Sequence, residues 1–163
     1  MNTVAATSLP TAALKVRQAA DRLGLTIAIR EMPQSTRTAE EAAAACGCDV
    51  AQIVKSLVFA GKASGAPYLL LVSGKNRVNE TAVGPIIGEA LTRADAQKVR
   101  DWTGFAIGGI PPFGHAIELP VFVDADLLAF DRVWAAAGTP FAVFSVEPKA
   151  LAHAVGGRAI TVT

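Results

Sequence analysis

The apolar run Tyr-Leu-Leu-Leu-Val at residues 68–72 places the strictest limit on how this chain can fold. Successive side chains of a strand point to opposite faces, so a strand of apolar residues alone must be covered on both faces. Residues 61–67 before the run are rich in glycine, serine and proline, as in a turn. We therefore predict a strand over residues 68–73 at the centre of a sheet.

Other short apolar segments predict further strands. An alternating, β-rich segment at residues 25–30 predicts the first strand, and the turn joins a strand over residues 56–60 to the central one. We predict three more strands, over residues 119–123, 141–146 and 158–162.

Helical patterns separate these strands. Apolar spacing predicts a helix over residues 11–23, and Gly24 ends it. Thr38 and Glu41 form a capping-box pattern that opens a helix through Ala45. We predict further helices over residues 80–87, 93–102 (capped by Thr92) and 148–155, and a short turn over residues 50–54 capped by Asp49 and Gln52. Strands and helices mixed in this way indicate an α/β or α+β domain with a mixed sheet.

Length and composition predict one domain. The chain has 163 residues, of which 52% are hydrophobic, enough to bury a core unaided. We predict a single domain over residues 11–163 after a flexible tail at residues 1–10. This tail lacks the cationic start of a signal peptide, and no apolar run approaches the roughly 20 residues that span a bilayer. We therefore expect a soluble, cytoplasmic protein with no membrane partner.

The charge balance bears on nucleic-acid binding. The chain has fifteen Lys and Arg residues and fourteen Asp and Glu residues, so its formal net charge is +1. Tight, sequence-independent duplex binding uses many phosphate contacts, so we expect no specific binding of duplex DNA. A local basic patch remains compatible with this balance.

Cys46 and Cys48 are the two cysteines. A disulfide between residues so close in sequence would strain the backbone between them. A metal site would need more ligands, and His115 and His153, the two histidines, have no ligand-type spacing to the cysteines. We therefore expect no metal and no cofactor, and interpret the thiols as small, half-buried side chains.

The segment Gly108-Gly109-Ile110-Pro111-Pro112-Phe113-Gly114-His115 is the strongest candidate for a site. Glycines let backbone N–H groups approach a ligand closely, and prolines fix the torsions beside them. Such a loop could hold a carbonyl oxygen or the oxyanion formed when that carbonyl is attacked. The same composition also suits a tight structural turn. The spacing fits neither a dinucleotide-binding fingerprint nor a P-loop.

Lys55 is a lone cation among apolar residues at the start of a predicted strand. A lone charge of this kind can mark a site, or the lysine side chain can simply reach water.

Other polar residues are also candidates. His115 could be a general acid or base, or a polar turn residue. Asn76 and Arg77 could donate to a phosphate or sugar, or lie in a solvated connection. The sequence shows no Ser/His/Asp order and no paired carboxylates.

Four motifs occur in order along the chain. They are Thr-Arg-Thr-Ala-Glu-Glu-Ala-Ala (36–43), Val-Lys-Ser-Leu-Val-Phe (54–59), Ser-Gly-Lys-Asn-Arg-Val (73–78), and Thr-Gly (103–104) with the loop at 108–115. Together they resemble the YbaK family, the editing domain associated with prolyl-tRNA synthetase, which also occurs as free-standing aminoacyl-tRNA deacylases. The resemblance runs from about residue 24 to the C-terminus.

This resemblance implies a single domain with a mixed β-sheet or partly closed barrel surrounded by helices. It also implies hydrolysis of the ester that joins a wrong amino acid to tRNA. Lys55 matches the family's site lysine, and Gly108 through Pro112 match its G-x-x-x-P loop, so we expect Lys55, Gly108 and Gly109 to be catalytic. The substrate contacts expected from the residues and the resemblance are Ser56, Asn76, Arg77, Ile110, Pro111, Pro112, Phe113, Gly114 and His115.

The resemblance is incomplete at one position. Members embedded in synthetases are expected to carry a further histidine downstream, and residues 137–141 have none. The amino acid that is removed therefore cannot be inferred from those members. Alanine on tRNA(Pro) is our first choice, and serine, threonine and cysteine remain open. The expected partners are the acceptor end of aminoacyl-tRNA and an aminoacyl-tRNA synthetase. The alternative is a non-catalytic tRNA- or nucleotide-binding module with the same fold.

Overall fold

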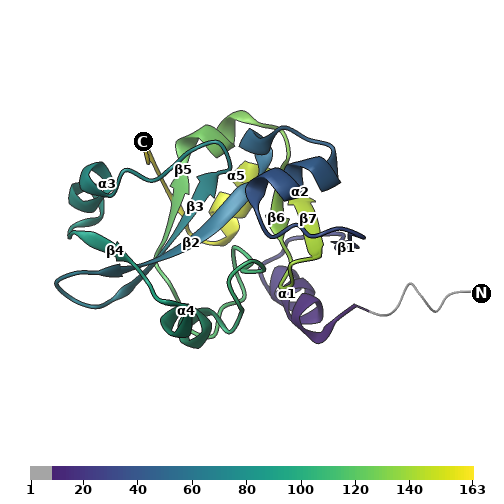
Figure 1. Ribbon diagram of the computed structural model, residues 1–163, viewed down its shortest axis with the longest axis horizontal. Helices are drawn as coiled ribbons and strands as arrows, with labels where there is room; N and C mark the ends of the chain where they lie inside the picture. The colour runs from purple at the N-terminus through teal and green to yellow at the C-terminus, as the bar shows by residue number, and fades with distance from the viewer. Residues whose placement is uncertain (1–8) are drawn as a thin grey trace, which may run out of the picture.

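The computed structural model describes residues 9–163, which form two β-sheets with helices packed against them. The tail expected at residues 1–10 lies outside the described residues except for Leu9 and Pro10. Helix α3 (Glu80–Ile87) and strand β4 (Leu91–Arg93) lie at one end of the molecule, and the smaller sheet lies at the other (Figure 1). No helix in residues 9–163 is both long and apolar enough to cross a membrane.

The larger sheet has five strands in the order β4-β2-β3-β5-β8. Strand β2 (Val54–Gly61) pairs antiparallel with β3 (Pro67–Ser73) and with β4, whereas β5 (Val121–Asp124) runs parallel to β3 and β8 (Arg158–Ile160) runs parallel to β5. The sheet is therefore mixed. Strand β3 lies at its centre, and residues 69–72 are fully buried, as their unbroken apolar sequence predicts.

The smaller sheet has three strands in the order β1-β7-β6. These are β1 (Arg30–Glu31), β7 (Ala142–Val146) and β6 (Val133–Ala136), all antiparallel to their neighbours. A single bridge between Ile53 and Trp134 connects the two sheets at the start of β2. The two sheets do not close into a barrel, so the mixed-sheet form of the fold prediction is the correct one.

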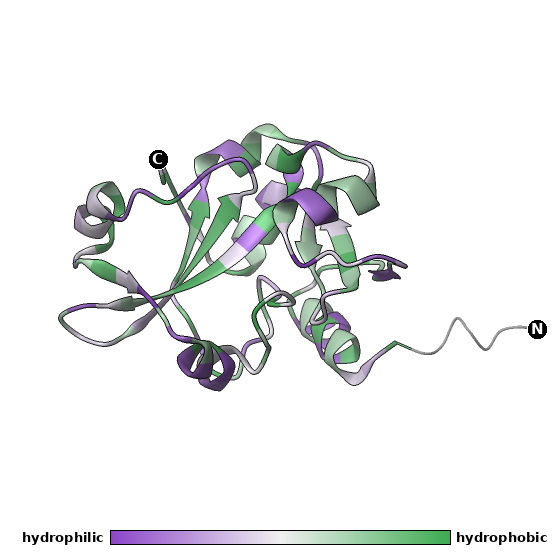
Figure 2. Ribbon diagram, in the orientation of Figure 1, coloured by the Kyte–Doolittle hydropathy of each residue, from purple (hydrophilic) through white to green (hydrophobic). Residues whose placement is uncertain are grey.

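The two faces of the central strands pack into separate cores. Val54, Val58 and Leu71 belong to the larger core, together with α1 (Thr11–Arg22) and Phe144. Phe59, Leu70 and Val72 face the other way, into a smaller core that includes Val83 of α3. Figure 2 shows hydrophobic colouring along most of these strands. Neighbouring residues of β2 therefore meet different surroundings.

The capping signals read from the sequence are confirmed near the start of β2. Thr38 caps α2 (Ala39–Cys46) in a capping box with Glu41, and Gly47 ends the helix at a φ of 69°. Asp49 and Gln52 form a second capping box around the 3₁₀ turn η2 (Val50–Gln52). These two short elements fix the chain directly before β2.

The remaining helices follow the predicted pattern closely. Helices α1 and α3 have nearly the predicted bounds, and α5 (Pro148–Ala154) lies between β7 and β8. Helix α4 (Ala96–Thr103) begins later than predicted, because Asp95 rather than Thr92 caps it through the Lys98 N–H. A 3₁₀ turn, η3 (Ala125–Ala129), was not predicted.

One strand prediction is wrong, and two strands of the structure had no prediction. Residues 25–29 are not a strand, although Leu25, Ile27 and Ile29 do pack against the core. The alternating pattern in the sequence therefore reflects burial of one side of this segment, and the segment pairs with no strand that the structure describes. Strands β4 and β6 were not predicted. They have three and four residues, too few for a periodic pattern to show.

Candidate functional site

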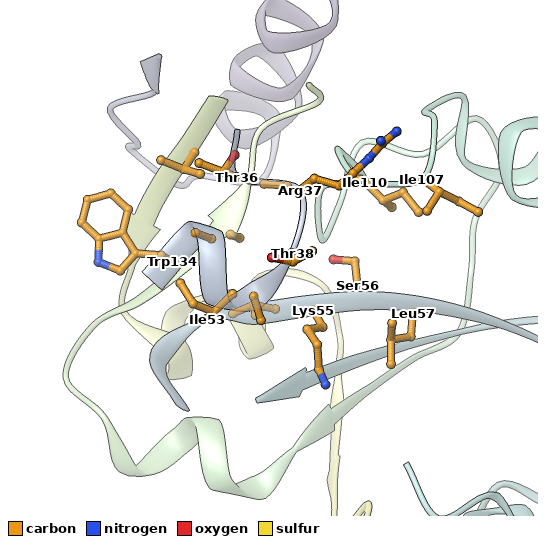
Figure 3. Close-up of a pocket in the computed structure, with 17 residues that line it drawn as sticks. Thr36, Arg37, Thr38, Ile53, Lys55, Ser56, Leu57, Ile107, Ile110 and Trp134 are labelled. Atoms are coloured by element: carbon orange, nitrogen blue, oxygen red, sulfur yellow. The ribbon is translucent and has the colours of Figure 1, made fainter. Parts of the chain in front are cut away.

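A pocket of about 230 Å³ lies where the two sheets meet (Figure 3). Its walls come from the segment before α2, the start of α2, the start of β2, the glycine-proline loop, and strands β6 and β7. The lining residues are Thr36, Arg37, Thr38, Ala39, Ala42, Ile53, Val54, Lys55, Ser56, Leu57, Ile107, Gly108, Ile110, Trp134, Ala135, Ala136 and Val143.

An unpaired edge of β2 forms one side of this pocket. Strand β4 pairs only with Phe59–Gly61, so within residues 9–163 the stretch before Phe59 has no neighbouring strand of the larger sheet on that side. Ala94 N–H donates to the Val58 carbonyl on the β4 side, at 3.2 Å. Backbone groups of a strand alternate in direction, so the N–H and C=O of Ser56 point the same way as those of Val58, toward the pocket.

The segment before α2 is held rigidly against the smaller sheet. Thr36 N–H and Thr36 Oγ1 both donate to the Pro140 carbonyl, at 2.7 and 2.9 Å. Thr38 Oγ1 accepts a hydrogen bond from Glu41 N–H at 3.1 Å. These bonds fix Arg37 between them on the pocket wall.

Arg37 packs directly against Gly108. A Cβ atom added at Gly108 would lie 2.8 Å from Arg37 Nε and 3.0 Å from its Cγ, and Gly108 has a φ of 102°. Both the close contact and the positive φ favour glycine at this position. The loop therefore approaches the segment before α2 as closely as a backbone without a side chain allows.

Lys55 lies on the opposite face of β2 from Ser56. In Figure 3, Ser56 projects toward Thr38, whereas Lys55 and Leu57 project from the other side of the strand. The Lys55 ammonium donates a hydrogen bond to the Asn76 carbonyl. Burial lowers the pKa of Lys55 below its ordinary value of 10.5, the Glu40 carboxylate opposes that effect, and the positive charges of Arg93 and Arg77 add to it.

A buried polar network supports the Asn76 carbonyl. Asn76 Nδ2 donates to one carboxylate oxygen of Asp124 and one of Asp126, both at 2.8 Å. Asp124 also accepts hydrogen bonds from Ser73 N–H at 3.0 Å and Asp126 N–H at 2.9 Å. Asp124 is 2% exposed and Asn76 8% exposed, so this network belongs to the interior. The Asn76 amide, expected to reach a substrate, is used within the protein instead.

Residues 33–154 match the sequence profile of the family described as the aminoacyl-tRNA editing domain. The chain belongs to this family. The match covers all the residues that line the pocket, from Thr36 to Val143.

Solved structures share the fold of this editing domain along nearly its whole length. One is the crystal structure of a protein proposed as a trans-editing enzyme for prolyl tRNA synthetase, with 46% identity and a TM-score of 0.89, covering 96% of this chain and 99% of that one. Another is the hypothetical protein APE2540, with 31% identity and a TM-score of 0.84, covering 91% of this chain and 98% of that one.

Curated relatives are similar over shorter stretches. The uncharacterized protein YwhH of Bacillus subtilis (strain 168) is 29% identical over 77% of this chain and 79% of its own length. The proline–tRNA ligase of Limosilactobacillus fermentum is 33% identical over 55% of this chain, but the match spans only 16% of the ligase. The editing domain therefore corresponds to a small part of that ligase.

The editing domain brings together some of the residues expected at the site. Lys55, Ser56, Gly108 and Ile110 all line the pocket. Arg77 lies outside the lining, is exposed, and is close enough to Lys55 to lower the pKa of that lysine.

Gly109 turns away from the pocket. Its N–H donates to the Ala106 carbonyl at 3.1 Å, and its carbonyl accepts from Gly138 N–H at 2.9 Å. A Cβ atom at Gly109 would lie 2.8 Å from Thr139 N. Its amide, expected beside Gly108 as a catalytic donor, therefore serves loop packing in this structure.

The second half of the loop lines a different cavity. Pro112, Phe113, Gly114 and His115 contribute to a cavity of about 460 Å³ near the ends of α1 and α5. His115 Nε2 lies 2.8 Å from the Pro111 carbonyl. Burial lowers the pKa of His115, and its hydrogen bond to Pro111 opposes that effect. These residues, with the buried Pro111, were expected at the substrate, but the structure does not bring them into the pocket with Lys55.

Several pocket residues were not among the expected site residues. Thr38 belongs to the motif quoted for the family resemblance, so its sequence did carry a signal. Ile53 and Trp134 carried none, because Trp134 lies on the unpredicted strand β6 and meets Ile53 only in the folded chain.

Proposed function

We propose that this editing domain is a trans-editing deacylase, which hydrolyses the ester bond between tRNA and a wrongly attached amino acid. The observation that carries the proposal is the pocket in which Gly108 and the unpaired edge of β2 meet beside Lys55. Membership of the editing-domain family and the likeness to a protein proposed to edit in trans support it.

In this proposal the two parts of the substrate occupy different places. The aminoacyl group enters the pocket, whose apolar walls include Ile53, Ile110 and Ala135. The terminal nucleotide lies beside Lys55, whose ammonium binds a phosphate or the ribose. Arg77 is exposed near Lys55, and Arg37 lines the pocket, so both guanidinium groups are near enough to contact the acceptor end.

The reaction needs few protein groups because the ester is already activated. Water attacks the ester carbonyl carbon, the bond from that carbon to the ribose oxygen breaks, and the water's protons end on the products, a free amino acid and the tRNA hydroxyl. The Gly108 N–H stabilises the oxyanion, and the vicinal ribose hydroxyl assists the water. Orientation of the ester by Lys55 supplies the remaining acceleration.

The size of the pocket favours small amino acids. Editing pockets select by size and by polar partners, so a pocket of about 230 Å³ suits the small residues that a synthetase attaches in error. Alanine on tRNA(Pro) is the first substrate to test, followed by serine, threonine and cysteine. An aminoacyl-tRNA synthetase is the partner expected to supply the mischarged tRNA.

A panel of mischarged tRNAs tests the proposal. We expect the purified protein to deacylate at least one member of the panel, and the Lys55→Ala variant to lose about 10- to 100-fold in rate, as expected for a charge-assisted contact. Lys98→Ala is the matched control, since Lys98 is exposed on α4 away from the pocket and should keep the wild-type rate.

Two results would overturn the proposal. The first is no deacylation above the buffer rate for any member of the panel. If uncharged tRNA then bound tightly and with strong salt dependence, the non-catalytic binding module would replace the deacylase. The second is full activity of Lys55→Ala on an active substrate.

A further inference from the structure

Among the described residues, three side-chain hydroxyls line the pocket, and two of them form hydrogen bonds within the protein. Thr36 Oγ1 donates to the Pro140 carbonyl, and Thr38 Oγ1 accepts from Glu41 N–H at the start of α2. Within residues 9–163, Ser56 Oγ has no hydrogen-bond partner, although it is shielded from solvent. Ser56 is therefore the hydroxyl of the pocket that no structural role accounts for.

The position of Ser56 makes a hydroxyl costly there. Its neighbours on the same face of β2 are Val54 and Val58, and its partner across the sheet is Leu71, all in the larger apolar core. A buried hydroxyl without a hydrogen-bond partner lowers the free energy of unfolding, and an alanine at this position would not carry that cost. A ligand with a suitable polar group would remove that cost.

The backbone of Ser56 narrows down which ligand group its hydroxyl meets. The Ser56 C=O and N–H point toward the pocket from the unpaired edge of β2. The carbonyl suits the α-ammonium that every aminoacyl group carries. This leaves the Ser56 hydroxyl for a polar group on the amino-acid side chain.

We propose that Ser56 is a specificity-determining residue, whose Oγ hydrogen-bonds the side-chain hydroxyl of a seryl or threonyl group. The domain then removes serine and threonine in preference to alanine, which offers only a methyl group. This inference rests on the proposed deacylase function, and it changes the order of substrates suggested by the sequence. Recognition of the amino acid lies on the Ser56 face of β2, and recognition of the nucleotide lies on the Lys55 face.

Removal of the hydroxyl tests the inference. In wild-type protein we expect seryl- and threonyl-tRNA to be deacylated about tenfold faster than alanyl-tRNA carried by the same tRNA, because one hydrogen bond of this kind supplies roughly that factor. Ser56→Ala should bring the three rates together by slowing the first two, whereas Ser56→Thr, which keeps a hydroxyl, should retain the preference.

Ser73→Ala is the matched control. Ser73 is a fully buried serine on the neighbouring strand β3, lies outside the pocket lining, and donates its hydroxyl to the Ala51 carbonyl at 2.7 Å. This variant should lower stability and leave the ratio of seryl to alanyl deacylation unchanged. A ratio that shifted equally in Ser73→Ala and Ser56→Ala would overturn the inference, because a general loss of packing would then explain both.

A binding measurement separates this inference from the proposed function. Adenosine analogues that carry a seryl or an alanyl group through a stable 3′-amide cannot be hydrolysed, so calorimetry reports recognition alone. We expect the seryl analogue to bind wild-type protein about tenfold more tightly, and both to bind Ser56→Ala equally. Equal affinities for the wild type would overturn the inference even if deacylation occurs. A seryl preference without deacylation of any tRNA would support the role of Ser56 and overturn the deacylase.

Discussion

Lys55 and Ser56 are consecutive residues on opposite faces of strand β2, and the two faces differ in chemistry. On one face, Lys55 donates to the Asn76 carbonyl, and the Asn76 amide in turn donates to the carboxylates of Asp124 and Asp126. On the other face, Ser56 is surrounded by apolar residues, and its hydroxyl has no hydrogen-bond partner in the part of the chain that the structure describes. The first face holds the Lys55 ammonium in place through a hydrogen bond, and the second offers the Ser56 hydroxyl to a ligand inside a small pocket. The comparison teaches that one strand can present different halves of a substrate with different chemistry.

The largest expected effect concerns the network beneath Lys55. Asp124→Ala removes the acceptor of three hydrogen bonds. The buried Ser73 N–H and the Asp126 N–H lose this partner, and the buried Asn76 amide keeps only its bond to Asp126. We expect a loss of about 3 kcal/mol in the free energy of unfolding, measured by urea denaturation.

Asp126→Ala is the control for that network. Asp126 is exposed and accepts one side-chain hydrogen bond from Asn76, so its loss should cost about 1 kcal/mol or less. If the two variants proved equally stable, the Lys55 face would lack the rigid support described here, and the contrast between the faces would weaken.

The next effect concerns the loop that closes the other face. Gly108→Ala places a Cβ atom 2.8 Å from Arg37 Nε at a φ of 102°, so Arg37 or the loop must move. We expect the deacylation rate to fall about tenfold, since backbone strain of about 1–2 kcal/mol at this position displaces the proposed oxyanion donor.

Gly65→Ala matches this variant in backbone strain but not in position. Gly65 has a φ of 72°, and a Cβ atom there would meet nothing within 4 Å. It should lower stability by about 1 kcal/mol and leave deacylation unchanged. Equal losses of activity in the two glycine variants would count against a special role for Gly108.

The smallest effect is a difference in pH dependence between the two faces. Burial lowers the pKa of Lys55 below 10.5, so its ammonium is fully charged only below that lowered pKa, and the charge is lost as the pH rises through it. We expect the affinity for uncharged tRNA to weaken at a pH below 10.5, in step with the Lys55 Cε chemical shift in an NMR titration. The relative affinity for seryl and alanyl analogues should stay constant over the same range, because Ser56 does not titrate. A Lys55 midpoint at or above 10.5 would contradict this prediction.

Local signals predicted most of the fold. The capping boxes at Thr38 and Asp49 are confirmed because the side chain and backbone that form each box are only three residues apart. The buried centre of the sheet at β3 follows from an apolar run that needs cover on both faces. The pairing of β1 with β7 and the bridge from Trp134 to Ile53 depend on contacts between distant parts of the chain, which short segments do not encode.

The candidate site was predictable only in part, for a related reason. Lys55 and Gly108 were expected at a common site, and both line the pocket. The sequence predicts one site for the whole loop at residues 108–115. In the structure, Gly108 and Ile110 line the pocket, whereas Phe113 and His115 line another cavity. Composition can identify a rigid loop, whereas the direction of each residue depends on the surfaces that pack against it.

Single-turnover deacylation of seryl- and alanyl-tRNA by wild type, Lys55→Ala and Ser56→Ala tests the account most directly. We expect Lys55→Ala to slow both substrates by the same factor and so preserve their ratio, and Ser56→Ala to remove the ratio by slowing only the seryl substrate. If Lys55→Ala changed the ratio as Ser56→Ala does, or if neither variant changed any rate, the assignment of the two faces of β2 to two parts of the substrate would be contradicted.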